Sequence, residues 1–160
     1  MTVQKGDLVP DATLGHMGAN GPEGLDTKTL FTGKKVVLFS VPGAFTPTCS
    51  AKHLPGFIQH ADEFLSKGAD LIICTAVNDV FVMDAWGKAQ GAGDKVMMLA
   101  DGNGDFVNAL GLGLDGSGFG MGQRGQRFSM IVDDGKVTEL NVEEPGAFHV
   151  SSAEYTLVQL

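Results

Sequence analysis

Two continuous apolar runs, residues 34–41 and 69–77, constrain the fold of this 160-residue chain more than any other feature. A strand with one solvent-exposed face alternates polar and apolar residues, whereas an apolar run without alternation is typical of a strand buried on both faces. Between the runs the apolar spacing changes to three and four residues, which predicts a helix that begins at Pro47, is kinked by Pro55 and ends at Gly68. A buried strand, a helix and a second buried strand favour a sheet covered by helices.

The rest of the chain continues this alternation. Asn78 and Asp79 predict the start of a helix that runs to Gln90, and a third strand and a short helix follow at residues 96–100 and 106–110. We therefore expect an α/β chain with a thioredoxin-like fold, in which a central mixed β-sheet is flanked by helices on both faces. At this length, residues 1–160 should form a single domain.

The C-terminal part carries two local signals. Asp133-Asp134-Gly135 lies between two strand patterns and predicts a hairpin. Ser151 and Glu154 have the spacing of a capping box at the start of a terminal helix. The glycine-rich stretch before the hairpin contains two G-x-G-x-x-G matches, but it follows a helix and leads into a strand, so a flexible loop is expected there rather than a dinucleotide site.

Composition excludes several classes of partner. The chain has 11 Lys and Arg against 19 Asp and Glu, a net charge of −8, and its basic residues are scattered. Nucleic acids and anionic membranes need clustered basic residues, so neither is expected as the main partner. The N-terminus lacks the apolar core of a secretory signal and no apolar run is long enough to span a membrane, so we expect a soluble, cytoplasmic protein.

The two cysteines do not form a disulfide framework, and together with the four histidines they show no metal-ligand spacing. No metal site is expected. Cys49 instead lies where a thiol becomes reactive, because Thr46 predicts an N-cap and Pro47 the first helical position. Cys49 then meets unpaired backbone N–H groups and the positive end of the helix dipole, which favour the thiolate.

A single thiolate in this position suits attack on a peroxide oxygen, which gives a sulfenic acid. The reaction also needs a hydroxyl donor and a cation that stabilises charge on the leaving oxygen. Thr46 supplies the hydroxyl. Arg124 and Arg127 are the two candidates for the cation, and an arginine at the start of a strand is ordinarily a solvated edge residue.

The spacing Pro42-x-x-x-Thr46-x-x-Cys49 resembles the active-site motif of the peroxiredoxins. The stretch 41–49 and the following His53-Leu54-Pro55-Gly56-Phe57 are similar to the type II branch, the peroxiredoxin-five subfamily. The similarity covers nearly the whole chain and continues through Val77-Asn78-Asp79, Phe81, Trp86-Gly87, Leu99-Ala100-Asp101, Arg127-Phe128-Ser129-Met130 and Asp134-Gly135.

The resemblance implies a thiol-dependent peroxidase that reduces hydrogen peroxide and alkyl hydroperoxides without haem, flavin or metal. It implies that Cys49 is the peroxidatic nucleophile, Pro42 shields the thiolate, Thr46 hydrogen-bonds the peroxide, and Arg127, which directly precedes Phe-Ser-Met, is the cation. It also implies the pocket neighbours Gly43, Phe45 and His53, and a homodimer built near Phe45, Phe81 and Trp86.

Cys74 lies in the second apolar run, where a thiol is ordinarily buried and inert. Some type II relatives carry a resolving cysteine near the C-terminus, where this chain has Ser151 and Ser152. Cys49 is therefore recycled either by an external thiol (glutathione, glutaredoxin or thioredoxin) or by Cys74 as the resolving cysteine, and the second route requires local unfolding.

Three other functions compete with the peroxidase. A thiol–disulfide oxidoreductase would need a second cysteine in a C-x-x-C motif, which Thr46-x-x-Cys49 lacks. A cysteine-protease dyad would pair Cys49 with His53, one helical turn away. A redox sensor or chaperone-like binding protein would use the same oxidisable thiol without turnover.

Overall fold

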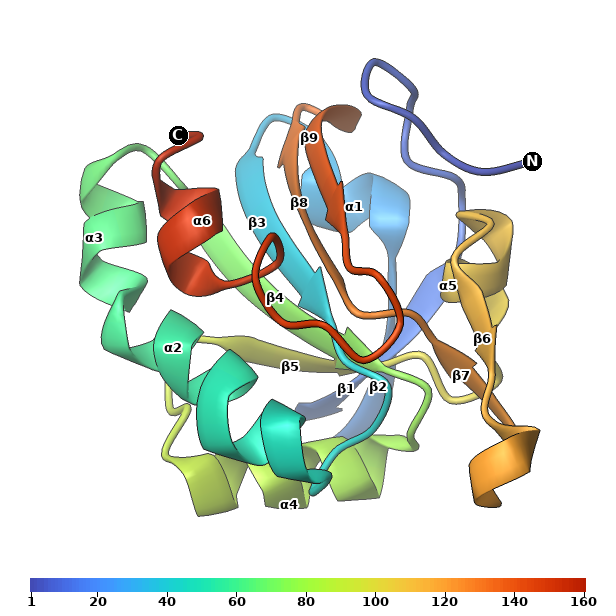
Figure 1. Ribbon diagram of the computed structural model, residues 1–160. Helices are drawn as coiled ribbons and strands as arrows, with labels where there is room; N and C mark the ends of the chain where they lie inside the picture. Colours follow the sequence, from blue (N-terminus) through green and yellow to red (C-terminus); the bar gives the residue numbers. More distant parts are fainter.

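The computed structural model describes residues 1–160, which build one mixed sheet of seven strands in the order β2-β1-β5-β4-β3-β8-β9 (Figure 1). Its strands are β1 (Thr13–Gly18), β2 (Gly21–Asp26), β3 (Lys35–Ser40), β4 (Leu71–Ala76), β5 (Met97–Ala100), β8 (Phe128–Asp133) and β9 (Lys136–Val142). The central strands β3, β4 and β5 are parallel, and the outer strands on both sides pair antiparallel. The expected mixed sheet is confirmed.

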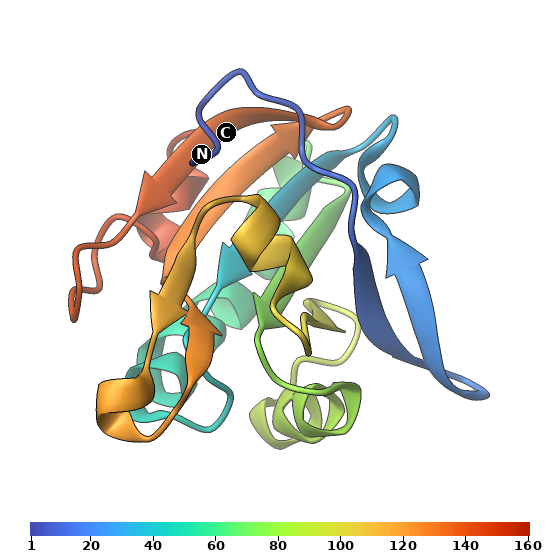
Figure 2. The ribbon, with the colours of Figure 1, turned by 90° about the vertical axis from the view of Figure 1, so that its right-hand side faces the viewer.

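Helices cover both faces of the sheet (Figures 1 and 2). One face carries α2 (Leu54–Gln59), α3 (Ala61–Ser66), α4 (Val80–Gln90) and α6 (Ala153–Leu157), and the other carries α1 (Thr27–Phe31) and α5 (Asp105–Ala109). Val37 and Phe39 of β3 point into the first cluster of apolar side chains, and Val36 and Leu38 into the second. The thioredoxin-like arrangement is therefore confirmed. None of the helices is both long and apolar enough to cross a membrane.

The helix after β3 is interrupted where a single kinked helix was predicted. It begins at Pro47, opens into a π-helical turn η1 (Cys49–His53), continues as α2 and breaks again at His60 before α3. The N–H of Leu54 donates to the carbonyl of Cys49, five residues back. Pro55 has no N–H to offer and its ring crowds the preceding turn, which explains why the widened turn lies directly before it.

The glycine-rich stretch is not the flexible loop that the sequence predicted. It forms a two-stranded antiparallel sheet of β6 (Gly113–Asp115) and β7 (Gln123–Gly125), with the short 3-10 helix η2 (Ser117–Phe119) at its tip (Figure 2). Gly120 and Gly122 have φ values of +71° and +66°, which a residue with a side chain adopts only under strain. Glycine at these two positions therefore allows the chain to turn between β6 and β7.

Of the caps predicted for α4 and α6, the first is confirmed and the second is shifted by one residue. Asp79 caps α4 by accepting a hydrogen bond from the N–H of Val82 at 2.9 Å. The cap of α6 is Ser152, which accepts from Tyr155 N–H at 3.2 Å, so the predicted capping box between Ser151 and Glu154 is wrong. The hydroxyl of Ser151 instead donates a hydrogen bond to Glu143 Oε2.

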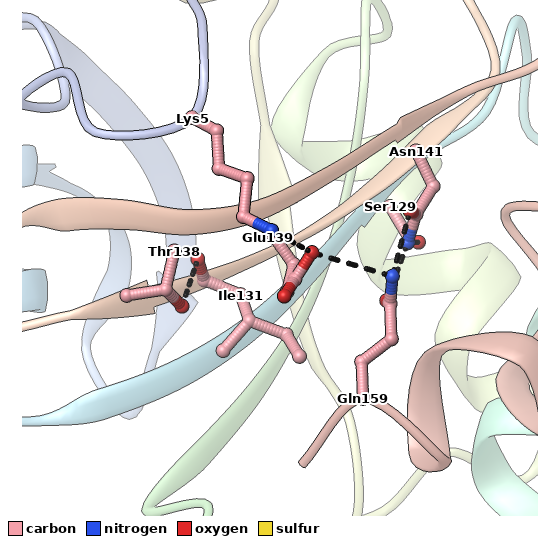
Figure 3. Close-up of polar contacts among 7 residues, drawn as sticks. All are labelled: Lys5, Ser129, Ile131, Thr138, Glu139, Asn141 and Gln159. Carbon is pink, nitrogen blue, oxygen red and sulfur yellow. Dashed lines mark hydrogen bonds and ion pairs between the residues drawn. The ribbon is translucent and has the colours of Figure 1, made fainter.

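A polar network fastens the C-terminal segment to the outer strands β8 and β9 (Figure 3). The amide nitrogen of Asn141 donates to Ser129 Oγ at 3.0 Å and to Gln159 Oε1 at 2.7 Å, and Gln159 Nε2 donates back to Asn141 Oδ1 at 3.0 Å. Ser129 Oγ also lies 2.7 Å from Thr156 Oγ1 of α6. These contacts fix α6, and the residues just before it, against the sheet.

Candidate active site

Cys49 lies in the first turn of the helix that follows β3, and its side chain is fully buried and free of any disulfide. The loop between β3 and this helix is hydrogen-bonded at two points to the end of β4 and the residues just after it. Val41 N–H donates to Thr75 O at 3.1 Å, and Ala44 N–H donates to Asn78 Oδ1 at 2.9 Å. The structure thus presents the thiol at the end of the central strand, inside the protein.

Thr46 contacts the sulfur directly. Its Oγ1 lies 2.8 Å from Cys49 Sγ and 2.7 Å from Gly43 O. The helix begins after Thr46, as predicted, but the side chain makes no capping hydrogen bond to the backbone N–H groups of the helix. The hydroxyl therefore faces the thiol and the loop rather than the helix end.

Arg127, the residue before β8, supplies the second contact to the sulfur. Its Nη2 donates to Cys49 Sγ at 3.0 Å, and its guanidinium carbon lies 6.0 Å from the ring centroid of Phe148. Arg124 instead donates through Nε to Met121 O at 2.8 Å and through Nη1 to Val77 O at 3.2 Å. Of the two candidate arginines, the structure places only Arg127 on Cys49.

His53 lies behind Arg127 and does not contact the thiol. Its Nε2 lies 2.9 Å from the carbonyl oxygen of Ser151, so Nε2 carries the proton, and its Nδ1 accepts from Arg127 Nη1 at 2.8 Å. Burial, followed by the charge of Arg127, lowers the pKa of His53 to about 3. A neutral ring with both nitrogens occupied is no general base for Cys49, which argues against the protease dyad.

The other predicted neighbours line the loop before Cys49. A Cβ on Gly43 would lie 3.2 Å from Thr46 Cγ2 and 3.3 Å from Arg124 Nη1, so the site has little room for a side chain there. Phe45 has a φ of +65°, a strained conformation for a bulky residue, and is 57% exposed. Pro42 is half-buried at the start of the loop.

Cys74 is buried in β4, opposite Phe39 of β3, and belongs to the same apolar cluster as Cys49. Burial, and then the proximity of Cys49, raise the pKa of the Cys74 thiol well above its usual value. Cys74 is therefore protonated at neutral pH and has no path to solvent in this conformation.

Sequence reasoning missed two groups behind the site, the carbonyl of Ser151, which contacts His53, and the ring of Phe148, which lies beside Arg127. Neither left a signal, because a backbone carbonyl has no residue signature and a lone aromatic residue is ordinarily a packing residue. No group of three or more His, Cys, Asp or Glu side chains lies together in a way that could hold a metal ion.

The chain is similar to known proteins along nearly its whole length. The sequence profile of the Redoxin family matches residues 4–157. The chain is 51% identical to Peroxiredoxin-2B of Arabidopsis thaliana over 156 residues, which cover 97% of this chain and 96% of that protein. It is 50% identical to the chloroplastic Peroxiredoxin-2E of the same plant over 166 residues, 99% of this chain and 70% of that protein.

A solved structure is similarly close. The crystal structure of reduced Prx3 in complex with H2O2 from Vibrio vulnificus superimposes with a TM-score of 0.96 at 52% identity, and the match covers 99% of both chains. The fold and the motif around Cys49 agree with these matches, which cover nearly the whole chain with about half of the aligned residues identical. The chain belongs to the redoxin family and, within it, to the type II peroxiredoxins.

Proposed function

We propose that Cys49 is the peroxidatic nucleophile of this chain, with Thr46 and Arg127 as the groups that orient and polarise the peroxide. As a peroxiredoxin, the protein is a thiol-dependent peroxidase. One observation supports the assignment of roles most strongly: a hydroxyl and a guanidinium from distant parts of the chain lie 2.8 Å and 3.0 Å from the same buried sulfur. A cysteine that serves only as an apolar core residue does not need two polar side chains at its sulfur.

The proposed reaction follows from these contacts. The Cys49 thiolate attacks one peroxide oxygen, the S–O bond forms as the O–O bond breaks, and the leaving oxygen takes a proton to become water or an alcohol. Cys49 is left as a sulfenic acid. Arg127 stabilises the negative charge that moves onto the leaving oxygen, Thr46 holds the peroxide by a hydrogen bond, and Pro42 shields the thiolate from water.

The proposed substrates are hydrogen peroxide and small alkyl hydroperoxides. The Vibrio vulnificus Prx3 structure contains H2O2, and that protein is 52% identical to this chain. Gly43 and Phe45, which border the loop before Cys49, are proposed as pocket neighbours. The test is a stopped-flow measurement of Cys49 oxidation by hydrogen peroxide and by an alkyl hydroperoxide, with Cys49→Ser as the inactive control. Equal slow oxidation of both chains would refute the assignment.

An external thiol is the proposed reductant, because Cys74 is buried and protonated. A first thiol converts the sulfenic acid into a mixed disulfide with loss of water, and a second thiol releases Cys49 and leaves as a disulfide. Glutaredoxin with glutathione, and thioredoxin with its reductase, are the two systems to compare in a steady-state assay. We expect Cys74→Ser to keep most of the activity. Loss of turnover with the first oxidation intact would make Cys74 the resolving cysteine.

The same assay separates the enzyme from a redox sensor or chaperone-like protein. A sensor would be oxidised once and would show no repeated turnover with either thiol system.

We also propose the cytoplasm as the compartment of the protein. The two free cysteines of the chain support this, because disulfides are rare in a reducing compartment.

A homodimer is proposed near the exposed aromatic residues Phe45 and Phe81. Phe45 and Phe81 are 57% and 64% exposed, whereas Trp86 is fully buried and belongs to the core. Large exposed apolar side chains are typical of interfaces. We expect Phe81→Asp to be a monomer by light scattering where the wild-type chain is a dimer, and Val158→Asp, at an exposed site near the C-terminus, to remain a dimer. A wild-type monomer would contradict the proposal.

A further inference from the structure

Glu143 is a buried carboxylate directly after β9, and the reaction described above does not use it. The residue is 7% exposed. Its Oε2 accepts three hydrogen bonds, from His149 N–H at 2.6 Å, from Ser151 N–H at 2.8 Å and from Ser151 Oγ at 2.6 Å. Burial acts to raise the pKa of this carboxyl, but the hydrogen bonds from Ser151, His149 and Val150 outweigh it and lower the pKa below its usual value. Glu143 is therefore ionised at neutral pH.

The segment that wraps around this carboxylate supports the site at two points. The Ser151 carbonyl accepts the Nε2 proton of His53 at 2.9 Å, and the Phe148 ring lies 5.0 Å from the His53 ring and 6.0 Å from the Arg127 guanidinium carbon. The backbone N–H of Glu143 also donates to the carbonyl of Arg127 at 3.0 Å. Glu143 therefore hydrogen-bonds both to the backbone of Arg127 and to the segment that carries Phe148 and Ser151.

We infer that Glu143 is a positioning residue for Arg127, acting through the Ser151 carbonyl and His53. The inference rests on the proposed function of Cys49. With the carbonyl in place, His53 carries its proton on Nε2 and offers a bare Nδ1 to Arg127 Nη1. Without it, the ring is free to carry the proton on Nδ1, where it would face another donor. The guanidinium would then lose the contact that aims Nη2 at the Cys49 sulfur.

Glu143→Gln tests the inference, because it keeps the side-chain size and one acceptor oxygen but removes the negative charge to which the three donors bind. The rate of Cys49 oxidation by hydrogen peroxide is followed through the fluorescence of Trp86, whose Nε1 donates to Ser50 Oγ beside the reacting cysteine. We expect oxidation about tenfold slower, less than the loss of a direct charge-stabilising donor would cause. The pH midpoint of the Cys49 thiolate absorbance at 240 nm should also rise.

Glu144→Gln is the matched control, since Glu144 is the adjacent acidic residue and is exposed. Both readouts should stay at their wild-type values in this variant. An unchanged oxidation rate and thiolate midpoint in Glu143→Gln, even with a lowered melting temperature, would overturn the inference and leave Glu143 as a structural anchor.

A double-mutant cycle with His53→Gln tests the route. If Glu143 acts through His53, the double variant is no slower than the slower single variant, whereas independent effects would multiply and refute the route.

If Glu143→Gln does not fold, Ser151→Ala replaces it in all measurements. This variant removes one donor to the carboxylate but keeps the Ser151 carbonyl, so we expect Cys49 oxidation to be about threefold slower. Wild-type and Cys49→Ser chains are measured first: failure there refutes the proposed function, and failure of Glu143→Gln alone refutes only this inference.

Discussion

At the scale of single residues, the site depends on a buried sulfur that has two hydrogen-bond donors. Cys49 is fully buried, as inert core cysteines are, and burial alone would not make it reactive. The contacts from Thr46 Oγ1 and Arg127 Nη2 distinguish it from Cys74, which is equally buried and has no such donors. We therefore propose that the reactivity of Cys49 depends on these two side chains, which separate mutations can remove.

Arg127→Ala should slow peroxide reduction by about 100-fold, because it removes the donor that stabilises charge on the leaving oxygen. Stopped-flow oxidation by hydrogen peroxide measures the effect. Arg124→Ala is the control, since Arg124 donates only to backbone carbonyls and should leave the rate within about a factor of three. Normal turnover in Arg127→Ala with a damaged Arg124→Ala would show that the wrong arginine had been assigned.

Thr46→Val should harm catalysis more than stability. Valine has nearly the same shape but no hydroxyl, so the peroxide loses a hydrogen bond and the rate should fall by about tenfold or more, while the half-buried position limits the loss of unfolding free energy to about 1 kcal/mol. Peroxide kinetics and urea unfolding measure the two effects. Thr46→Ser keeps the hydroxyl and should remain active. A Val variant that melts earlier yet reduces peroxide normally would give Thr46 a purely structural role.

At the scale of elements, the residues of the site lie where regular structure ends or is disturbed. Cys49 and His53 bound the π-helical turn before Pro55, and Arg127 directly precedes β8. π-helical turns in other proteins are also frequent at functional sites. The segment after β9 lies behind the site and leads directly into α6. The stability of that helix on the sheet therefore bears on the geometry around Arg127.

Asn141→Ala should loosen α6 from the sheet. Asn141 joins Ser129 of β8 to Gln159 of the C-terminal segment (Figure 3), and its removal takes away all three hydrogen bonds between its amide and these two residues. Ser129 then keeps only its contact to Thr156. We expect a loss of about 1–3 kcal/mol in the free energy of unfolding, measured with urea. Lys5→Ala breaks only the ion pair between the exposed Lys5 and the half-buried Glu139, and it should cost less than about 1 kcal/mol. Equal losses in the two variants would mean that the network does not stabilise α6.

At the scale of the whole molecule, the buried His53 makes folding stability depend on pH. Its pKa is lowered from 6.5 to about 3 in the folded chain, so below pH 6.5 the unfolded chain binds one more proton than the folded one. Stability is therefore lost as the pH falls through 6.5. Between pH 7.5 and 5.5 this single group should cost about 1.4 kcal/mol.

His53→Gln tests this dependence, because glutamine does not titrate. Urea unfolding at pH 7.5 and 5.5 should show a smaller loss of stability in the variant than in the wild-type chain, by about the amount that one histidine contributes. The absolute stability of the variant does not affect the comparison, since each chain is compared with itself at two pH values. An identical pH dependence in both chains would mean that the pKa of His53 is not lowered by folding.

The sequence by itself determined the alternation of elements and the thiol around which the site is built. The apolar runs of β3 and β4 are local patterns, and so is the helix start around Pro47, which is why they could be predicted without the fold. The π-helical turn and the β6–β7 hairpin could not, because a widened turn and a paired glycine-rich strand depend on contacts with neighbouring segments.

Only the tertiary structure decided which groups meet the sulfur. β8 pairs antiparallel with β3 so that Phe128 lies opposite Ser40, which places Arg127 just beyond the end of β3, where the chain turns toward Cys49. Arg124, three residues earlier, belongs to the β6–β7 hairpin and points to backbone carbonyls. Strand register determines the choice between the two arginines, and the same long-range pairing brings Glu143 and Ser151 behind His53. No local pattern encodes it, because the partners are about eighty or more positions away in the chain.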